Sequence, residues 1–78
     1  MSTFERLVQV FNTVFEDEVD VSAIGESTSL RKDLGISSIG MLYMAMALEE
    51  EFSIKFSNDD LMKLTTVADV IACIEGKS

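Results

Sequence analysis

The chain is 78 residues long and 47% hydrophobic, so we expect one small domain that spans residues 1–78 and buries a core. Its 14 acidic and 6 basic residues give a net charge of −8, and Arg31-Lys32 is the one basic pair, which argues against binding of nucleic acid. The chain has no histidine and a single cysteine, Cys73, which excludes Ser-His and Cys-His nucleophile pairs, an internal disulfide and the common zinc-site patterns. We therefore expect no metal site and no self-contained enzyme.

The sequence shows no targeting or membrane signal. It lacks a leader with a basic start and an apolar run long enough to span a bilayer, so we expect a cytoplasmic protein without an integral membrane segment. The negative charge should attract proteins with basic surfaces and speed their encounter in a salt-dependent way. We expect the chain itself to be a monomer.

The first predicted helix occupies the N-terminal segment. Ser2 and Glu5 have the spacing of a capping box, which marks the start of a helix. The helix dipole disfavours the acids between Glu16 and Asp20 at a C-terminal end, so the helix should stop near them. The apolar residues recur at the spacing of one helical face: Phe4, Leu7, Val8, Phe11, Val14 and Phe15.

A long connection follows, from about Val19 to Ile36. It keeps scattered apolar residues without any regular period, and Gly25 and Gly35 interrupt it. A connection of this length is uncommon in a small domain and is more often functional than idle. We expect it to be pinned to the core and to deliver the chain to the pair of serines that opens the next helix.

The second helix is predicted from Ser37 or Ser38 to Phe52, a stretch without proline and rich in helix formers. A serine at a helix start usually caps free backbone N–H groups, which is worth about 1 kcal/mol. Only one of the two serines is needed for this purpose. Ser37 can be the helix cap, which leaves Ser38 free. A phosphate ester on Ser38 would suit the unpaired N–H donors and partial positive charge of a helix N-terminus.

The second helix carries two apolar arcs on a helical wheel. A helix needs a single apolar stripe to join a bundle, so the second arc is either a widened core contact or an exposed docking surface. Ile39, Leu42 and Met46 form this second arc, with Glu49 between the two arcs and Glu50 beside the second. The first arc, which is predicted to face the core, consists of Met41, Met44, Ala45, Leu48 and Phe52.

Two further helices are predicted in the last third of the chain. Ser57 and Asp60 have capping-box spacing ahead of a short helix, and Thr66 and Asp69 repeat it ahead of a longer one that Gly76 should end. No alternating strand pattern competes with this interpretation. The predicted fold is all-α, an irregular four-helix bundle with a long loop between the first and second helices and a short third helix.

The stretch Asp33–Phe52, which reads DLGISSIGMLYMAMALEEEF, resembles the prosthetic-group site of acyl carrier proteins. In that family Asp-Leu-Gly, two more residues and Ser-Leu precede a helix that ends in a glutamate run and a phenylalanine. The similarity continues without a gap to about Gly76 and includes the LTTV run at Leu64–Val67. It implies that a separate phosphopantetheinyl transferase attaches 4′-phosphopantetheine from coenzyme A to Ser38. The chain would then be a non-catalytic, freestanding carrier that holds an acyl group as a thioester.

The resemblance also favours the docking interpretation of the second arc, because this helix is the main recognition element of carrier proteins. It implies partners with basic docking surfaces, the acyl-loading and acyl-processing enzymes of fatty acid, polyketide or related lipid biosynthesis. An aminoacyl or peptidyl carrier and an unmodified helical interaction module are the open alternatives. The expected partner contacts are Ile39, Leu42, Met46, Glu49 and Glu50.

The sequence departs from the family pattern around the serine. Ser37 stands where the family commonly has an aspartate, and Gly40 and Tyr43 occupy exposed early turns that commonly carry acids. Asn58 and Met62 also stand at positions that are often acidic. These changes should weaken steering by basic enzymes and shift discrimination toward shape and apolar contact. We therefore predict a specialised carrier with a restricted set of partners.

The methionines Met41, Met44, Met46 and Met62 are interpreted as core-filling residues. Their soft, unbranched side chains would let the interior of the bundle rearrange around a guest acyl chain. Sequestration of the acyl chain is a hypothesis that follows from this interpretation.

Overall fold

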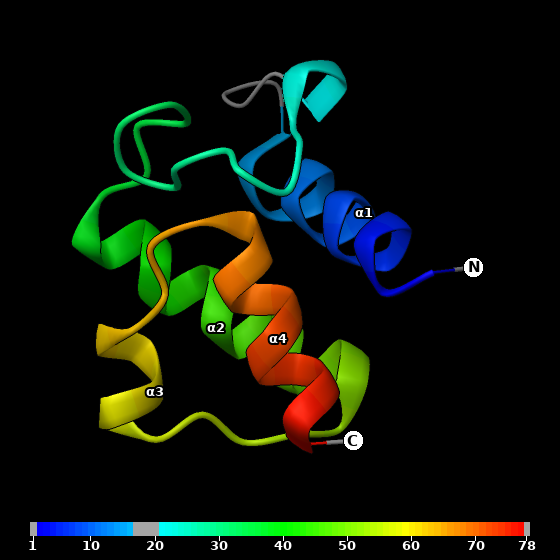
Figure 1. The fold of residues 1–78 in the computed structure, drawn as a ribbon, viewed down its shortest axis with the longest axis vertical. Coiled ribbons are helices and arrows are strands. Elements are labelled where there is room, and N and C mark those ends of the chain that lie inside the picture. Colours follow the sequence, from blue (N-terminus) through cyan, green and yellow to red (C-terminus); the bar gives the residue numbers. More distant parts are fainter. Residues whose placement is uncertain (1, 17–20, 78) are drawn as a thin grey trace.

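Four α-helices and one short 3-10 turn make up the computed structural model, which describes residues 2–16 and 21–77 (Figure 1). The helices are α1 (Thr3–Phe15), α2 (Ser38–Phe52), α3 (Asn58–Met62) and α4 (Val67–Lys77), and the 3-10 turn is η2 (Val21–Ala23). The predicted all-α architecture, with a long first connection and a short third helix, is confirmed. Part of the predicted acidic end of α1, at residues 17–20, lies outside the described residues. No helix in the described ranges is long and apolar enough to cross a bilayer.

Reciprocal hydrogen bonds between side chain and backbone start three of these helices. At α1 the Ser2 hydroxyl accepts a bond from the N–H of Glu5 at 3.1 Å, and Glu5 Oε1 accepts one from the N–H of Ser2 at 3.0 Å. Such a pair satisfies two backbone donors that a helix start would otherwise leave unpaired. The predicted boxes ahead of α3 and α4 are confirmed as well: Ser57 with Asp60, and Thr66 with Asp69.

The helix ends are less regular than the starts. Ser53 ends α2 in the left-handed conformation, with φ of 55°, and its N–H donates to the carbonyl oxygen of Glu49. The prediction that Gly76 ends the last helix is wrong, since α4 continues to Lys77. The side chain of Lys77 extends to Asp60, where its Nζ lies 2.8 Å from Oδ2 and ties the last turn of α4 to the start of α3.

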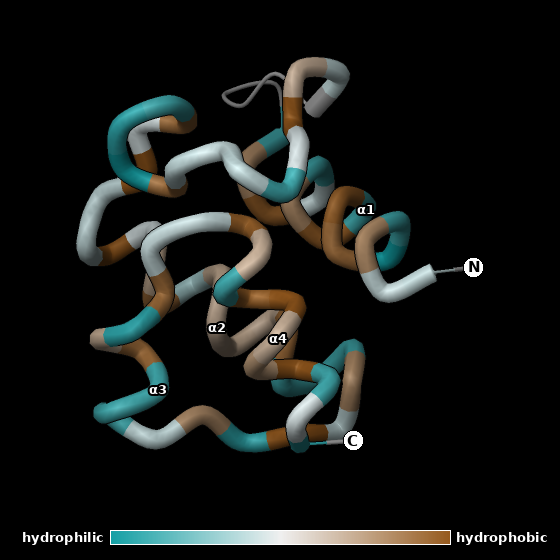
Figure 2. Tube along the Cα trace, in the orientation of Figure 1, coloured by the Kyte–Doolittle hydropathy of each residue, from teal (hydrophilic) through white to brown (hydrophobic). Residues whose placement is uncertain are grey.

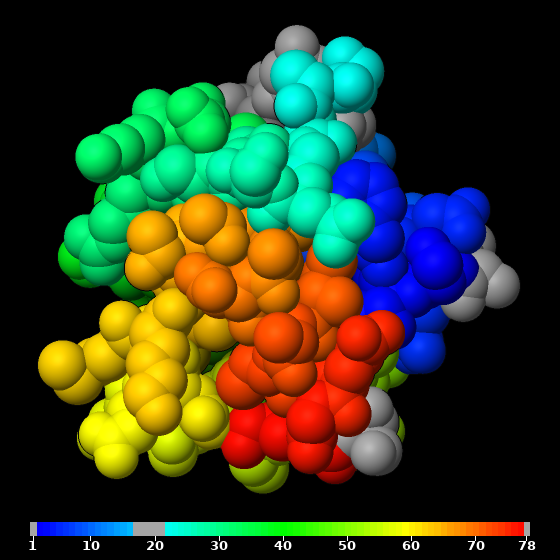
Figure 3. All heavy atoms as spheres, in the orientation of Figure 1, coloured from blue at the N-terminus to red at the C-terminus, as the bar shows by residue number. Residues whose placement is uncertain are grey.

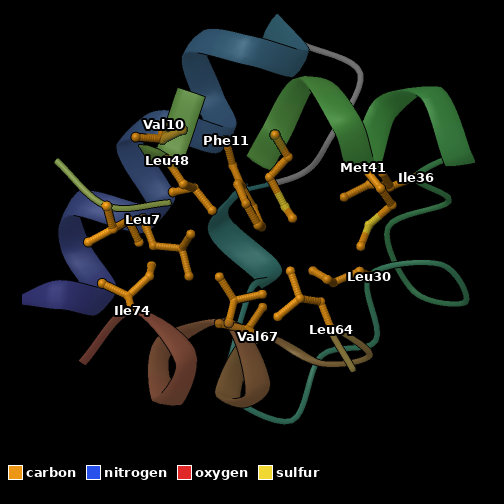
Figure 4. Packing of buried hydrophobic residues seen from close by; sticks show 13 residues of the cluster. Leu7, Val10, Phe11, Leu30, Ile36, Met41, Leu48, Leu64, Val67 and Ile74 are labelled. Atoms are coloured by element: carbon orange, nitrogen blue, oxygen red, sulfur yellow. The ribbon is translucent and has the colours of Figure 1, made fainter. Parts of the chain in front are cut away.

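The core lies where α1, α2 and α4 meet beneath the long loop (Figure 4). Leu7 and Phe11 of α1 and Leu48 of α2 are fully buried there. The loop contributes Leu30 and Ile36, so the prediction that it is pinned to the core is confirmed. Hydrophobic and hydrophilic stretches alternate along α1 in Figure 2, as an amphipathic helix requires. The remaining members of the buried cluster are Val10, Met41, Met44, Ile54, Leu64, Val67, Val70 and Ile74.

The long loop is fastened to the segment that precedes α4. Ser29 and Thr66 form an isolated antiparallel bridge, and the N–H of Leu30 donates to the carbonyl oxygen of Thr65 at 2.9 Å. Figure 3 shows the two segments side by side, the loop in cyan to green and the residues before α4 in orange. These bonds fix the end of the loop from which α2 starts.

Arg6 joins α1 to the far end of α2. Its Nε donates to Oε2 of Glu51 at 3.0 Å, its Nη2 donates to the carbonyl oxygen of Glu51 at 2.8 Å, and the guanidinium lies 4.2 Å from the ring centroid of Phe52. Both charged side chains are partly exposed, so the ion pair alone contributes little. The main-chain bond and the stacking on Phe52 define the orientation of the guanidinium.

The methionines fall into two groups. Met41 and Met44 are buried, as predicted. Met46 is 64% exposed and Met62 is 84% exposed, so the core-filling interpretation is wrong for both. Met62 is the last residue of the short helix α3, and Leu64 takes the core-facing place just after it.

Candidate prosthetic-group attachment site and docking surface

The two serines at the start of α2 do different things. Ser37 is the N-cap: its hydroxyl accepts from the N–H of Gly40 at 3.1 Å, and its carbonyl oxygen accepts from the N–H of Met41 at 2.8 Å. Ser38 is the first residue of α2 and is exposed. Its hydroxyl has one polar neighbour among the described residues, Nη2 of Arg31 at 3.5 Å. The Ser38 hydroxyl is therefore accessible and is not needed to cap the helix.

The residues before the serines hold them at a defined corner. Oδ2 of Asp33 accepts from the N–H of Ser29 at 2.7 Å, and the N–H of Asp33 donates back to the carbonyl oxygen of Ser29 at 3.0 Å. Gly35 has a φ of +67°, a conformation that glycine adopts at little cost. Ile36 is buried, and its N–H donates to the carbonyl oxygen of Leu30 at 3.0 Å. The backbone is thus anchored immediately before the serine pair.

A groove of about 580 Å³ opens beside Ser38, between the start of α2, α3 and the long loop. Its apolar walls come from α2, α3 and the turn after α3, whereas the loop side is polar. Such a groove can take a long, mostly apolar group that is attached at its rim. Its lining consists of Ser29, Arg31, Lys32, Ser38, Met41, Leu42, Leu61, Met62, Leu64 and Thr65.

The surroundings of Ser38 favour negative charge. Arg31 and Lys32 both line the loop side of the groove, and within the described part of the chain neither makes an ion pair with a carboxylate. In the same part of the chain, the backbone N–H groups of Ser38 and Ile39 have no hydrogen-bond acceptor. Cations and free helix-start donors together form a favourable environment for a phosphate ester.

The second apolar arc of α2 is exposed and is not a widened core contact. Ile39 is 65%, Leu42 54% and Met46 64% exposed, and Tyr43 beside them is 60% exposed. Residues 38–47 contain no charged side chain at all. The first half of α2 therefore presents an apolar, uncharged surface next to Ser38.

The acids of the predicted docking surface differ from one another. Glu50 is exposed. Glu49 is partly buried, and its Oε2 accepts from the N–H of Phe56 at 2.8 Å, while its carbonyl oxygen accepts from the N–H of Ile54 at 3.1 Å. Glu49 therefore fixes the turn after α2, a role that a helical wheel does not reveal.

Gly40 is half-buried beside Ile36 and the end of α1, so the prediction that it occupies an exposed turn is wrong. A Cβ atom on Gly40 would lie 3.0 Å from Cγ2 of Ile36 and 3.4 Å from Cε1 of Phe15. The missing side chain lets the start of α2 lie close to the end of α1. Tyr43, at the other position that lacks the family's acid, is exposed as predicted.

Sequence reasoning gave no functional role to Arg31 and placed Met62 in the core. Both residues line the groove beside Ser38. Arg31 reaches Ser38 through an irregular loop, and Met62, the last residue of α3, lines the groove together with residues of α2. Neither arrangement follows a helical period, so the only signal in the sequence was the basic pair Arg31-Lys32 in a strongly acidic chain.

Comparison with known proteins gives matches over almost the whole chain. The family model described as a phosphopantetheine attachment site matches residues 5–74. The chain is 45% identical over 78 residues to an acyl carrier protein of Exiguobacterium sp., covering 99% of both proteins. It is 32% identical over 79 residues to an acyl carrier protein of Thermotoga maritima, covering 99% of this chain and 98% of the relative.

The helical bundle and this family match define a phosphopantetheine-carrying domain. The relatives, which are matched along their full length, are acyl carrier proteins. The chain belongs to the acyl carrier protein family, whose members are carriers and not catalysts and hold a covalent 4′-phosphopantetheine group.

The residues around Ser38 fit this group. The hydroxyl is exposed and uncommitted, the adjacent N–H groups and Arg31 suit a phosphodiester, and the groove beside it is open to a long chain. Among the described residues, the Ser38 hydroxyl is the one that combines exposure, a helix start and this groove.

Proposed function

We propose that Ser38 is the attachment residue, and that the protein carries an acyl group as a thioester to partner enzymes in the cytoplasm. The proposal rests on one observation, the different roles of the two adjacent serine hydroxyls. The Ser37 hydroxyl caps α2, which leaves the exposed Ser38 hydroxyl beside an apolar groove. When attached, the group would supply a thiol at the end of a flexible arm, which is the chemistry needed to hold an acyl group as a thioester.

Attachment requires a separate phosphopantetheinyl transferase. The chain has no histidine, and a serine hydroxyl is a weak nucleophile without an adjacent base. The Ser38 oxygen forms a bond to the phosphorus that bears pantetheine in coenzyme A, and the bond from that phosphorus to the adenosine bisphosphate moiety breaks. A base of the transferase takes the serine proton, and adenosine 3′,5′-bisphosphate leaves.

Partners bind, in this proposal, to the exposed arc of α2. Ile39, Leu42 and Met46 supply apolar contact beside the arm, and Glu50 supplies an exposed charge at the far end. Glu49 adds a second negative charge there, held in place by its bond to the turn after α2. The partners are enzymes that load or process acyl groups in fatty acid, polyketide or related lipid biosynthesis, with surfaces that combine apolar and basic groups.

The uncharged first half of α2 points to a carrier with a restricted set of partners. Enzymes that rely on basic residues to dock near the serine find no acid there, so discrimination shifts to shape and apolar contact. We expect common fatty-acid-synthesis enzymes to use this carrier more slowly than a housekeeping acyl carrier protein in the same assay. Comparable rates with both carriers would contradict this part of the proposal.

The direct test is modification in vitro. The protein is incubated with coenzyme A, Mg²⁺ and a panel of phosphopantetheinyl transferases, and its intact mass is measured. We expect the gain of one phosphopantetheinyl group, which Ser38→Ala abolishes and the matched control Ser37→Ala retains. No gain with any transferase would favour an unmodified interaction module. Loading of the modified protein by aminoacyl-activating enzymes but not by acyl-loading enzymes would favour the aminoacyl carrier.

A further inference from the structure

Arg31 is a cation without a carboxylate partner among residues 2–16 and 21–77. The chain has two arginines, and Arg6 pairs with Glu51 at 3.0 Å. Within the described residues the one polar side-chain contact of Arg31 is with Ser38 Oγ, at 3.5 Å. That distance is at the outer limit of a hydrogen bond, so the contact itself stabilises little. In a chain with a net charge of −8, an arginine beside a hydroxyl and without an ion pair among the described residues is available to bind another negative group.

A phosphodiester on Ser38 would supply the missing partner. It would carry one negative charge on two non-bridging oxygens, bonded to the phosphorus next to Oγ, and Oγ lies 3.5 Å from Nη2 of Arg31. Arginine binds such a group through a planar fork of N–H donors, and these charge-assisted bonds are stronger than neutral ones. The N–H groups of Ser38 and Ile39, which have no acceptor among the described residues, face the same charge.

We propose that Arg31 binds the phosphodiester of the prosthetic arm and thereby directs the arm along the groove between α2 and α3. This inference rests on the proposed attachment at Ser38. Arg31 and Ser38 both line this groove, whose apolar residues lie on the side away from the loop. Arg31 is a positioning residue that lowers the mobility of the arm at its base and leaves the thiol end free.

Lys32 provides the matched control. It is adjacent in sequence, lines the same groove and carries the same charge, but among the described residues its side chain makes no hydrogen bond to Ser38. An ammonium is also a compact point charge that cannot present the planar fork of a guanidinium. If Arg31 acts through specific geometry, the two cations differ. If only the local positive charge matters, removing either cation has the same effect.

The test uses the unmodified and the phosphopantetheinylated full chain with ¹⁵N-labelled arginine. Two Nε–H resonances are expected, because the chain has two arginines. On modification, we expect the Arg31 resonance to shift and its exchange with water to slow about threefold or more, as a charge-assisted bond forms. The Arg6 resonance serves as the internal reference, because Arg6 is bound to Glu51 and Phe52 at the opposite end of α2, and it should not change.

Variants separate positioning from general charge. We expect Arg31→Gln to shift the ³¹P resonance of the modified protein and to increase the mobility of the pantetheine amides measured by relaxation. Arg31→Lys should restore both in part, and Lys32→Gln, which removes the same charge from the same groove, should change both clearly less than Arg31→Gln does. Intact mass first verifies that every variant is modified, and circular dichroism verifies that each is folded.

The outcomes distinguish the two proposals. An absent mass gain in the wild-type protein overturns the proposed function and this inference with it. A normal mass gain with an unchanged Arg31 resonance overturns this inference alone. Equal effects of Arg31→Gln and Lys32→Gln on the ³¹P resonance and on the mobility of the arm also overturn it. They would show that the phosphodiester responds to local positive charge in general and not to a specific contact with Arg31.

Discussion

The adjacent serines at the start of α2 show how one residue type takes two roles according to its backbone position. Ser37 lies outside the helix in an extended conformation, with φ of −76° and ψ of 172°, so its hydroxyl can turn back to the free N–H of Gly40. Ser38 already has helical geometry, so its hydroxyl points outward to solvent. The cap keeps the free serine at the very first residue of the helix, where the N-terminal field is strongest.

Stability measurements separate these two roles. We expect Ser37→Ala to lower the free energy of unfolding by about 1 kcal/mol, because it removes the cap of α2. Ser38→Ala should change it by less than about 0.5 kcal/mol, because no described group depends on that hydroxyl as a partner in the core. Urea denaturation of the unmodified proteins, followed by circular dichroism, gives both values. The reverse order would show that Ser38 is the structural residue.

At the scale of the elements, the contact between α1 and α2 depends on a residue without a side chain. Replacing Gly40 by an acid would restore the charge that the family commonly has at this position. Its Cβ, however, would lie only 3.0 Å from Cγ2 of Ile36 and 3.4 Å from Cε1 of Phe15. We expect Gly40→Glu to lower the free energy of unfolding by about 1–3 kcal/mol, as overpacking commonly does. Tyr43→Glu, at an exposed position one turn further on, should be nearly neutral.

Thermal and urea unfolding of the two variants test this contrast. The mutations add the same charge to the same helix, and replacing glycine improves helix propensity, so a lower stability of Gly40→Glu than of Tyr43→Glu reports the close packing around Gly40. Equal stability of Gly40→Glu and Tyr43→Glu would contradict the close approach of the two helices.

The short helix α3 is joined to α4 by a partly exposed ion pair between Asp60 and Lys77 that depends on pH. The hydrogen bond from Lys77, together with the bond from the N–H of Ser57, lowers the pKa of Asp60 from 3.8 to about 2. Since the pKa is lower in the folded state, the contribution of Asp60 to stability is present above about pH 4 and is lost as the pH falls toward about 2. We expect Asp60→Asn to flatten the acid limb of the stability curve in this window.

A carboxyl carbon titration by NMR gives the pKa of Asp60 directly. Asp59→Asn is the matched control, because it removes an acid from the same helix without touching the bond to Lys77. If Asp59→Asn flattens the acid limb as much as Asp60→Asn does, the ion pair is not the cause.

The features of the fold that depend on interactions between residues close in sequence could be predicted. The three capping boxes involve residues three apart, so the helix starts at Ser2, Ser57 and Thr66 were visible in the sequence. The exposure of Met62 was not, because it depends on the place that a five-residue helix takes in the tertiary fold. The continuation of α4 past Gly76 was also hidden, since a spatial contact supports that last turn.

In the candidate site, too, the features set by local sequence could be predicted and those set by tertiary structure could not. Ser38 was predicted from a local motif and stays a prediction, whereas the second arc of α2 was predicted from helical periodicity and is exposed in the structure. The orientation of Arg31 toward Ser38 depends on the path of an irregular loop, and the bond of Glu49 to Phe56 depends on the turn after α2. Neither the loop nor the turn has a regular pattern of residues from which its course could be predicted.

On the scale of the whole molecule, the negative charge is unevenly placed. Residues 38–47 are uncharged, while acids cluster at the end of α2 and on α3. Recognition next to Ser38 should therefore depend little on salt. We expect the KM of a phosphopantetheinyl transferase for the wild-type chain to rise only weakly with NaCl, and Tyr43→Glu to lower it by about two- to fivefold at low salt.

Parallel titrations in NaCl check this expectation. The effect of Tyr43→Glu should disappear at about 1 M salt, where screening removes most exposed attraction. A steep salt dependence of the wild-type KM, equal to that of Tyr43→Glu, would show that distant acids steer the transferase and that the uncharged turn does not matter.

The last prediction concerns the route of the acyl chain. The groove beside Ser38 has methionines from two elements, the buried Met41 of α2 and the exposed Met62 of α3. If the chain enters this groove, it covers Met62 and presses on Met41, while Met46, which does not line the groove, stays unchanged. We expect the ¹³C-methyl resonances of Met41 and Met62 to shift on acylation and the resonance of Met46 to stay.

The stability of the acylated protein should also depend on whether the acyl chain enters the groove. Each methylene that leaves water for the groove contributes up to about 0.8 kcal/mol, so the free energy of unfolding should rise with acyl length until the groove is filled. Shortening the wall by Leu61→Ala should lower this increment for long chains and leave it unchanged for an acetyl group. Equal stability of acetyl and long-chain forms, with unshifted Met41 and Met62 methyls, would mean that the chain stays in solvent and that discrimination between cargoes lies with the partner enzymes.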